Sequence, residues 1–171
     1  MEERFGEIYD QYVVKIYRFI VLKVDSQEVA EDLCSEVFTR VFQEFQKQEI
    51  QNMQAFLYQV ARHIIADYYR DRASFRIVRI EEAEGLVARE HSLLEKAATL
   101  SEIEEVKQAL ANLRDEYQNL IIWRYLDELS IPEIAQLEGK SEGSVRVSLH
   151  RAMEALRGKL EVPKDAPSVP V

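Results

Sequence analysis

The stretch SIPEIAQLEGKSEGSVRVSLHRA, from Ser130 to Ala152, decides how the C-terminal half of the chain folds. Ser130 and Glu133 have the spacing of a capping box, in which the two side chains satisfy free N–H groups at the start of a helix. Gly139 follows where a tight turn needs a positive φ, and Ser141 can cap a second helix. The stretch therefore predicts a short helix, a glycine turn and a longer helix.

The longer helix has one apolar side and one polar side. The apolar residues recur at three- and four-residue steps and are Val145, Leu149, Met153 and Leu156. The other side holds Ser144, Val147, Ser148, His150 and Arg151, with Arg146 at its flank. A short helix, a glycine turn and a helix with a basic leading half are typical of a helix-turn-helix, which places its second helix in the major groove of DNA. The alternative is an ordinary helical hairpin with a solvated basic face.

The distribution of charge bears on this alternative. The chain has 171 residues and a formal net charge of −9, whereas a DNA-binding protein is expected to be basic, because release of cations from DNA supplies most non-specific affinity. Residues 62–80 and 140–160 are basic nonetheless, each with five Lys or Arg against two Asp or Glu. Charges more than about 10 Å away are largely screened at physiological salt. We therefore expect local phosphate contacts but weak DNA binding by the chain alone.

The N-terminal half predicts three more amphipathic helices. The first has an apolar stripe formed by Phe5, Ile8, Tyr9, Tyr12, Val13, Ile16 and Ile20. The second opens at a capping box of Asp25 and Glu28, buries Val29, Leu33, Cys34, Val37, Val41 and Phe45, and shows Asp32, Glu36 and Arg40 on its opposite face. The third, over about 54–71, buries Leu57, Val60, Ala61, Ile64 and Tyr68 and exposes Gln59, Arg62, His63 and Arg70.

These patterns predict an all-α chain of two small helical domains joined by a flexible acidic linker, the C-terminal domain being a helix-turn-helix domain. The predicted ranges are 1–75 for the first bundle, 76–100 for the linker, 101–160 for the second domain and 161–171 for a disordered tail with three prolines. No apolar run approaches the roughly 20 residues of a membrane span. With no signal-peptide pattern either, we expect a cytoplasmic protein.

The sequence offers no catalytic centre. Its three histidines, His63, His91 and His150, are far apart, and no metal-ligand cluster, phosphate-binding glycine loop or nucleophile motif is present. The single cysteine, Cys34, lies on an apolar stripe and is interpreted as a small buried hydrophobe. We therefore expect no enzymatic activity, no cofactor and no metal.

Three blocks of sequence together resemble a known family. They are EVAEDLCSEVFTRVF (28–42), MQAFLYQVARHIIADYYRDR (53–72) and LDELSIPEIAQLEGKSEGSVRVSLHRAMEALR (126–157). In order and spacing they resemble the extracytoplasmic-function sigma factors of bacterial RNA polymerase. The resemblance implies that the first block docks on the core polymerase, that the second reads and helps to open the minus-ten promoter element, and that the third reads the minus-35 element. It also implies core RNA polymerase, promoter DNA and an anti-sigma protein as partners.

Residue roles follow from the resemblance and from chemistry. The candidate polymerase contacts are Asp32, Glu36 and Arg40. Unstacked bases need aromatic surfaces and the backbone needs cations, so the minus-ten candidates are Tyr58, Arg62, His63, Arg70 and Arg72. Arginine can bond guanine through two hydrogen bonds, and the minus-35 candidates are Ser144, Arg146, Ser148, His150 and Arg151. His63 stands where the family often has Asn, and Val147 with Ser148 replaces a frequent Ser-Arg pair.

Two other functions remain open at this point. One is a stand-alone helix-turn-helix regulator whose N-terminal domain binds a partner or dimerises. The other is a helical adaptor with no role on DNA. A sigma factor shifts promoter DNA only with core polymerase present, a regulator shifts it alone, and an adaptor never does.

Overall fold

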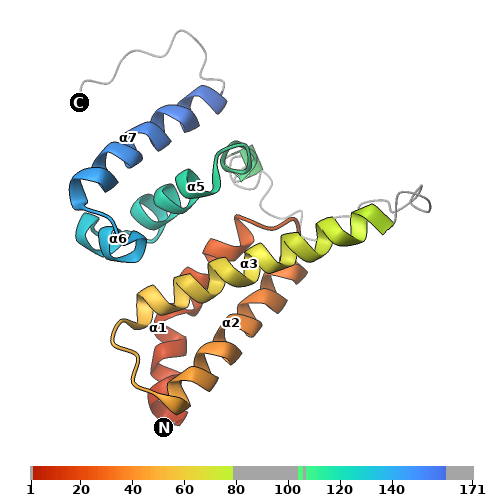
Figure 1. Cartoon of the computed structure of the whole chain (residues 1–171), viewed down its shortest axis with the longest axis vertical. Coiled ribbons are helices and arrows are strands. Elements are labelled where there is room, and N and C mark those ends of the chain that lie inside the picture. Colours follow the sequence, from red (N-terminus) through yellow and green to blue (C-terminus); the bar gives the residue numbers. More distant parts are fainter. Residues whose placement is uncertain (1, 79–103, 106, 161–171) are drawn as a thin grey trace, which may run out of the picture. The chain divides into compact units, whose positions relative to one another are not determined.

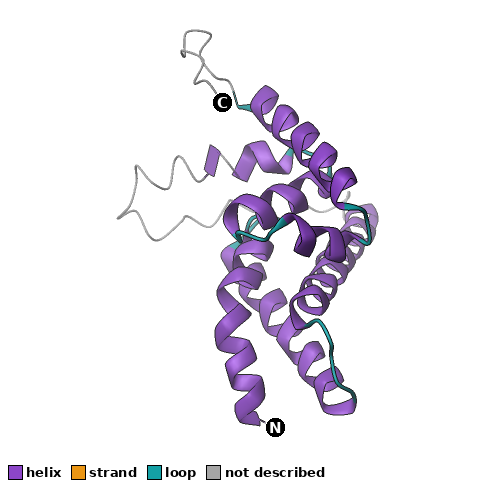
Figure 2. Cartoon of the chain, turned by 90° about the vertical axis from the view of Figure 1, so that its left-hand side faces the viewer, coloured by secondary structure: helices purple, strands orange, loops and turns teal. Residues whose placement is uncertain are grey.

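The computed structural model describes residues 2–78, 104–105 and 107–160, with the backbone alone for 74–78. Every regular element in these ranges is a helix (Figure 2). The chain divides into two compact units, Met1–Glu95 and Lys96–Val171. The prediction of an all-α chain with two helical domains is confirmed, whereas most of the predicted linker and the predicted tail lie outside the described residues.

The first unit contains three helices that pack against one another in every pair (Figure 1). They are α1 (Glu2–Val21), α2 (Gln27–Lys47) and α3 (Met53–Val78). Apolar side chains at helical spacing form its core, among them Ile16, Phe19 and Ile20 of α1, Leu33, Val37 and Val41 of α2, and Leu57, Ala61 and Ile64 of α3. The predicted apolar stripes thus account for most of this core.

Two boundaries in this unit differ from the prediction. Helix α2 is capped by Ser26, whose Oγ accepts a hydrogen bond from the Val29 N–H at 3.2 Å, rather than by Asp25. Helix α3 continues to Val78, past both the predicted helix end at about 71 and the predicted domain boundary at 75. No glycine or proline occurs in the sequence between Met53 and Gly85, so nothing local stops the helix where its apolar pattern fades.

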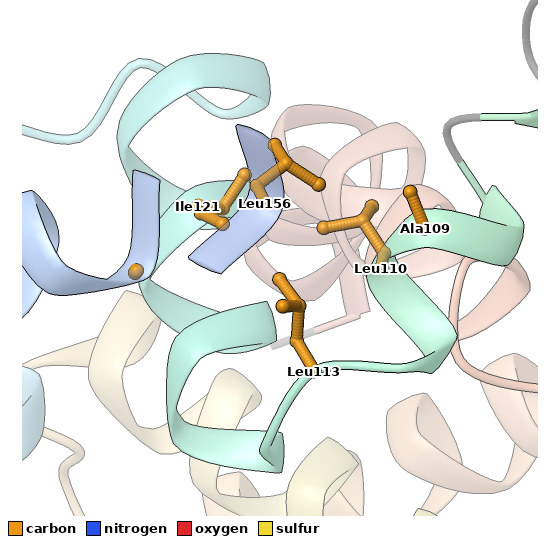
Figure 3. Packing of buried hydrophobic residues seen from close by; sticks show 6 residues of the cluster. Ala109, Leu110, Leu113, Ile121 and Leu156 are labelled. Carbon is orange, nitrogen blue, oxygen red and sulfur yellow. The ribbon is translucent and has the colours of Figure 1, made fainter. Parts of the chain in front are cut away.

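In the described part of the second unit, residues 104–105 and 107–111 are helical, and four elements follow them. They are α5 (Asp115–Ile121), the π-helical turn η2 (Ile122–Leu126), α6 (Ile131–Glu138) and α7 (Glu142–Lys159). Helices α5 and α6 both pack on α7. A compact apolar cluster joins the first segment and α5 to α7, and it consists of Ala109, Leu110, Leu113, Ile121, Ala152 and Leu156 (Figure 3).

The turn between α6 and α7 has the predicted construction. The Glu133 N–H donates to Ser130 Oγ at 3.3 Å, and the Ser130 N–H donates to Glu133 Oε2 at 2.7 Å, which completes the capping box. Gly139 has φ +63°. The Lys140 N–H donates a hydrogen bond to the Ala135 carbonyl at 3.0 Å, which closes the C-terminal end of α6. Both helix ends are therefore fixed by local hydrogen bonds, and these hold α7 in place relative to α6.

Candidate functional site

Helix α7 gathers the predicted minus-35 residues in its first half. Ser141 caps it by accepting a hydrogen bond from the Ser144 N–H at 3.2 Å. The side chains of Ser144, Arg146, His150 and Arg151 are exposed and that of Ser148 is half-buried. The buried residues of the same helix are Val145, Leu149, Ala152 and Leu156. The predicted polar face therefore exists as a surface of one helix.

The basic side chains on this face differ in how they are paired. Arg146 bonds Glu142 at 3.1 Å and His150 lies 3.4 Å from Glu154, both one turn along the helix and well exposed. Such pairs contribute only about 0.3–0.5 kcal/mol each, so DNA can displace them at little cost. Within the described part of the chain Arg151 pairs with no carboxylate, which makes it the cation best placed to meet DNA.

Lys140 lies in the basic stretch but has a structural role. Its Nζ is 2.6 Å from Glu116 of α5 and 3.2 Å from Glu138 of α6. Hydrogen bonds to Glu116 first and Glu138 second raise the pKa of this ammonium group. Lys140 therefore ties the turn to α5, and its charge is largely neutralised within the protein.

Tyr58 corrects one prediction in the minus-ten set. Its side chain is fully buried, at 0% exposure, and its ring packs edge-on against Phe19 of α1 with 5.4 Å between centroids. A base cannot stack on a ring that is enclosed by two helices. The expectation that Tyr58 is exposed for DNA contact is wrong, because α3 packs on both α1 and α2 and so buries a wider arc than one apolar stripe.

The other minus-ten candidates reach the surface of α3. His63 is exposed and Arg62 is half-buried. Arg70 lies 3.1 Å from Asp67. Arg72 pairs with Asp25, which precedes α2, and its Nη1 also donates to the Tyr68 hydroxyl at 3.0 Å. The phenol of Tyr68 first, and Asp25 second, raise the pKa of the Arg72 guanidinium, which stays charged.

The predicted polymerase-docking residues lie together on the outer side of α2. Asp32, Glu36 and Arg40 are all exposed, at four-residue steps opposite the buried Leu33, Val37 and Val41. Arg40 forms an ion pair with Glu36 one turn earlier. The three side chains form a polar strip along two turns of helix, and the ion pair within it contributes little to stability because both groups are in water.

A groove of about 750 Å³ lies between α1 and α2. Its lining is mainly aromatic and aliphatic, and it consists of Glu2, Phe5, Gly6, Tyr9, Asp10, Val13, Tyr17, Glu31, Cys34, Ser35, Phe38, Thr39 and Phe42. Its charged residues are three carboxylates with no Lys or Arg among them. Burial raises the pKa of the Cys34 thiol in this lining to about 11.

One exposed residue of α7 was not among the predicted site residues. Val147 is 52% exposed on the same face as Ser144 and Arg151. The sequence already places it on the polar side of this helix, because it lies two residues from each of the apolar Val145 and Leu149. The predicted residue sets lie on separate elements, with α2 and α3 in the first unit and α7 in the second.

Comparison with known families matches both units. Residues 8–75 match the model described as Sigma-70 region 2, and residues 103–156 match the model described as Sigma-70, region 4. The described helices of the chain are each too short or too polar to cross a bilayer.

Individual relatives agree with the family models. The chain is 31% identical to the ECF RNA polymerase sigma factor BldN of Streptomyces coelicolor, over 96% of its own length and 62% of that relative. It is 30% identical to the ECF RNA polymerase sigma factor ShbA of Streptomyces griseus, over 80% of its own length and 74% of that relative. The fold is similar to that of the sigma factor RpoE from Bartonella quintana, solved with the anti-sigma factor NepR, with a TM-score of 0.66, 19% identity, and coverage of 95% of this chain and 99% of that one.

Proposed function

The chain belongs to the extracytoplasmic-function sigma factors, the non-enzymatic subunits that direct RNA polymerase to promoters, and from that premise we propose which of its residues perform each task. The observation that carries the proposal is the order of two modules, a region 2 bundle at 8–75 and a region 4 helix-turn-helix at 103–156. A stand-alone regulator needs only the second. The chain binds core polymerase and promoter DNA, and we expect it to act in the cytoplasm, where both are found.

Dependence on core polymerase is the first test. Gel shifts with a promoter fragment, the purified chain, core polymerase and their combination separate the three functions. We expect a specific shift only for the combination. A shift by the chain alone would favour a regulator, and no shift in any lane would favour an adaptor.

The polar strip of α2 is the proposed polymerase contact. Its support is the exposure of Asp32, Glu36 and Arg40 together on one helical face. Reversing the pair, with Glu36→Lys and Arg40→Glu in one chain, should abolish binding to core polymerase while circular dichroism stays helical. The matched control reverses Glu44 and Lys47, another exposed ion pair of α2, with 2.7 Å between its atoms. If the strip variant binds core polymerase as tightly as this control, the strip is not part of the interface.

The first half of α7 is the proposed minus-35 reader. Ser144, Arg146, Ser148, His150 and Arg151 form its surface, and Arg151 has the least compensated charge. Arg151→Ala should weaken transcription from promoters with a minus-35 element by about tenfold, as expected for one lost bidentate contact, with core affinity unchanged. Arg157→Ala, at the C-terminal end of α7, is the control. Equal loss on promoters without a minus-35 element would contradict the assignment.

The exposed side of α3 is the proposed minus-ten surface, with Arg62, His63, Arg70 and Arg72 as its residues. A phosphate contact weakens all promoters alike, whereas a base contact changes their ranking. His63→Asn should therefore reorder transcription from a library of minus-ten variants, and Gln59→Asn, an exposed change one turn earlier, should not. If both variants keep the wild-type ranking, His63 does not select bases.

An anti-sigma protein is the third proposed partner, and the groove between α1 and α2 is its proposed docking site. An apolar lining with only negative charges suits an amphipathic helix with cationic flanks. Tyr9, 44% exposed in this lining, offers a variant that leaves the core intact. A protein that is recovered from native cells on the wild-type chain, is lost on Tyr9→Asp and inhibits the holoenzyme would support the proposal. If the recovered inhibitor binds the Tyr9→Asp chain as well as the wild-type chain, its docking site lies outside this groove.

A further inference from the structure

Val147 occupies the centre of the exposed face of α7. It is 52% exposed, while Val145 and Leu149, two residues away on either side, are 1% and 6% exposed. A separation of two residues is about 200° of rotation around an α-helix. The two methyl groups of Val147 therefore point away from the protein's core.

Polar groups surround this apolar side chain. Ser144 lies one turn before it and Arg151 one turn after it, both exposed on the same face. Gly143 lies four residues before it and presents no side chain, and a Cβ atom built there meets nothing within 4 Å. The surface beside Val147 is consequently open toward the N-terminal end of the helix, which is the end that contacts base edges in helix-turn-helix proteins.

The fold gains little from an apolar side chain at this position. A β-branched residue is a poorer helix former than alanine, and the half of the Val147 side chain that is exposed contributes no burial energy. In the major groove, however, the C5-methyl group of thymine is the apolar feature that distinguishes T·A from C·G at the same edge. A branched aliphatic side chain at the centre of the reading face has the chemistry to contact it.

We propose that Val147 contacts the methyl group of a thymine in the minus-35 element and selects that base over cytosine. The proposal rests on the assignment of α7 to the minus-35 element. Arg151 contributes a charge and a bidentate contact, whereas Val147 has no charge and acts through its methyl groups alone.

The test removes one methyl group at a time from the DNA. Holoenzyme assembled from core polymerase and the full chain first selects its preferred minus-35 sequence from duplexes randomised in that element. Each thymine is then replaced by deoxyuridine, which lacks only the C5-methyl group. We expect one replacement to weaken wild-type binding about fourfold, the value for one methyl group returned to water, and to leave the Val147→Ala holoenzyme unaffected.

Controls separate this inference from the function it rests on. Val14→Ala changes another exposed valine, 62% exposed on α1, and should keep the full response to deoxyuridine. A duplex with cytosine in place of this thymine lacks the methyl group, and 5-methylcytosine at the same position carries it again. The wild-type holoenzyme should therefore bind the methylated duplex about fourfold more tightly than the unmethylated one. A selected element without thymine, or an equal response of the wild-type and Val147→Ala holoenzymes, would overturn the role of Val147. Failure to select any minus-35 sequence would instead overturn the assignment of α7.

Discussion

Replacing Tyr58 by alanine should destabilise the first unit rather than weaken DNA contact. The side chain is fully buried between α1 and α3 and packs edge-on against Phe19. Truncating a buried aromatic residue to alanine costs about 3–5 kcal/mol, of which the lost ring pair is about 0.5–1.5 kcal/mol. A small domain is stable by only about 5–15 kcal/mol. The variant therefore loses a large part of the stability of this unit.

Two optical signals separate the two units. The sequence has one tryptophan, Trp123, which is fully buried in the second unit. Circular dichroism reports helices of both units, and Trp123 fluorescence reports the second unit. With a slope of about 1–3 kcal/mol per molar urea, Tyr58→Ala should move the first-unit transition in circular dichroism down by about 2 M. The fluorescence transition should stay in place.

His63→Ala provides the comparison, because an exposed side chain on the same helix should change stability by no more than about 0.5 kcal/mol. A Tyr58→Ala transition that coincides with that of the wild type would refute the burial argument. If Tyr58→Ala loses promoter opening while its stability is unchanged, the prediction that Tyr58 contacts DNA would hold instead.

Three more outcomes follow from the side-chain contacts. Ser130→Ala removes the capping-box acceptor of α6 and should lower the stability of the second unit by about 1 kcal/mol, seen as an earlier Trp123 fluorescence transition. Burial raises the pKa of the Cys34 thiol from 9.0 to about 11, so the thiol should react slowly with a thiol reagent at pH 8. Because the thiolate is the reactive form, the rate should rise by about tenfold for each pH unit above 8. A rate equal to that of the urea-unfolded chain would contradict this. Because the folded state holds that proton more tightly than the unfolded state, its contribution to stability is full below pH 9.0 and is lost as the pH rises toward 11. Asp25→Asn removes the partner of Arg72 and should change stability by less than about 1 kcal/mol, because the pair is exposed. The same variant should make promoter opening more tolerant of salt. Unchanged salt tolerance would place Arg72 away from phosphates.

Much of the fold could be predicted because local signals agree with one another. Apolar spacing located the buried Leu33, Val37 and Val41 in α2. The Ser130 and Glu133 pair and Gly139 define the turn before α7 through contacts within a few residues, and the structure has each of them. Where the physical cause is local, the sequence is sufficient to predict it.

The errors arose where a distant contact decides the outcome. Tyr58 is buried because a second helix covers the face beside the predicted stripe, although its spacing to Ala61 and Ile65, three and seven residues on, is a signal that could have been used. Asp25 and Ser26 are both good capping residues. Only the ion pair between Asp25 and Arg72, which are 47 residues apart in sequence, shows that the aspartate is engaged elsewhere.

The site residues were predicted less completely than the fold. Exposure of Asp32, Glu36 and Arg40 and of most α7 candidates follows from helical spacing alone. Their ion pairs do not, because several rotamers satisfy the same spacing. Val147 was placed on the polar side of α7 but not among the site residues, all of which have side chains that form hydrogen bonds, and the structure shows it 52% exposed.

Away from polymerase, the shortage of free cations beside α7 limits how long the chain stays on chromosomal DNA. Non-specific affinity grows with the number of counterions that a protein displaces, and Lys140, which already bonds Glu116 and Glu138, contributes little to that number. A bacterial chromosome offers on the order of a million or more competing sites, which would retain a strongly basic protein. This acidic chain should instead diffuse freely, so that its access to polymerase follows its own concentration and the chromosome does not act as a reservoir.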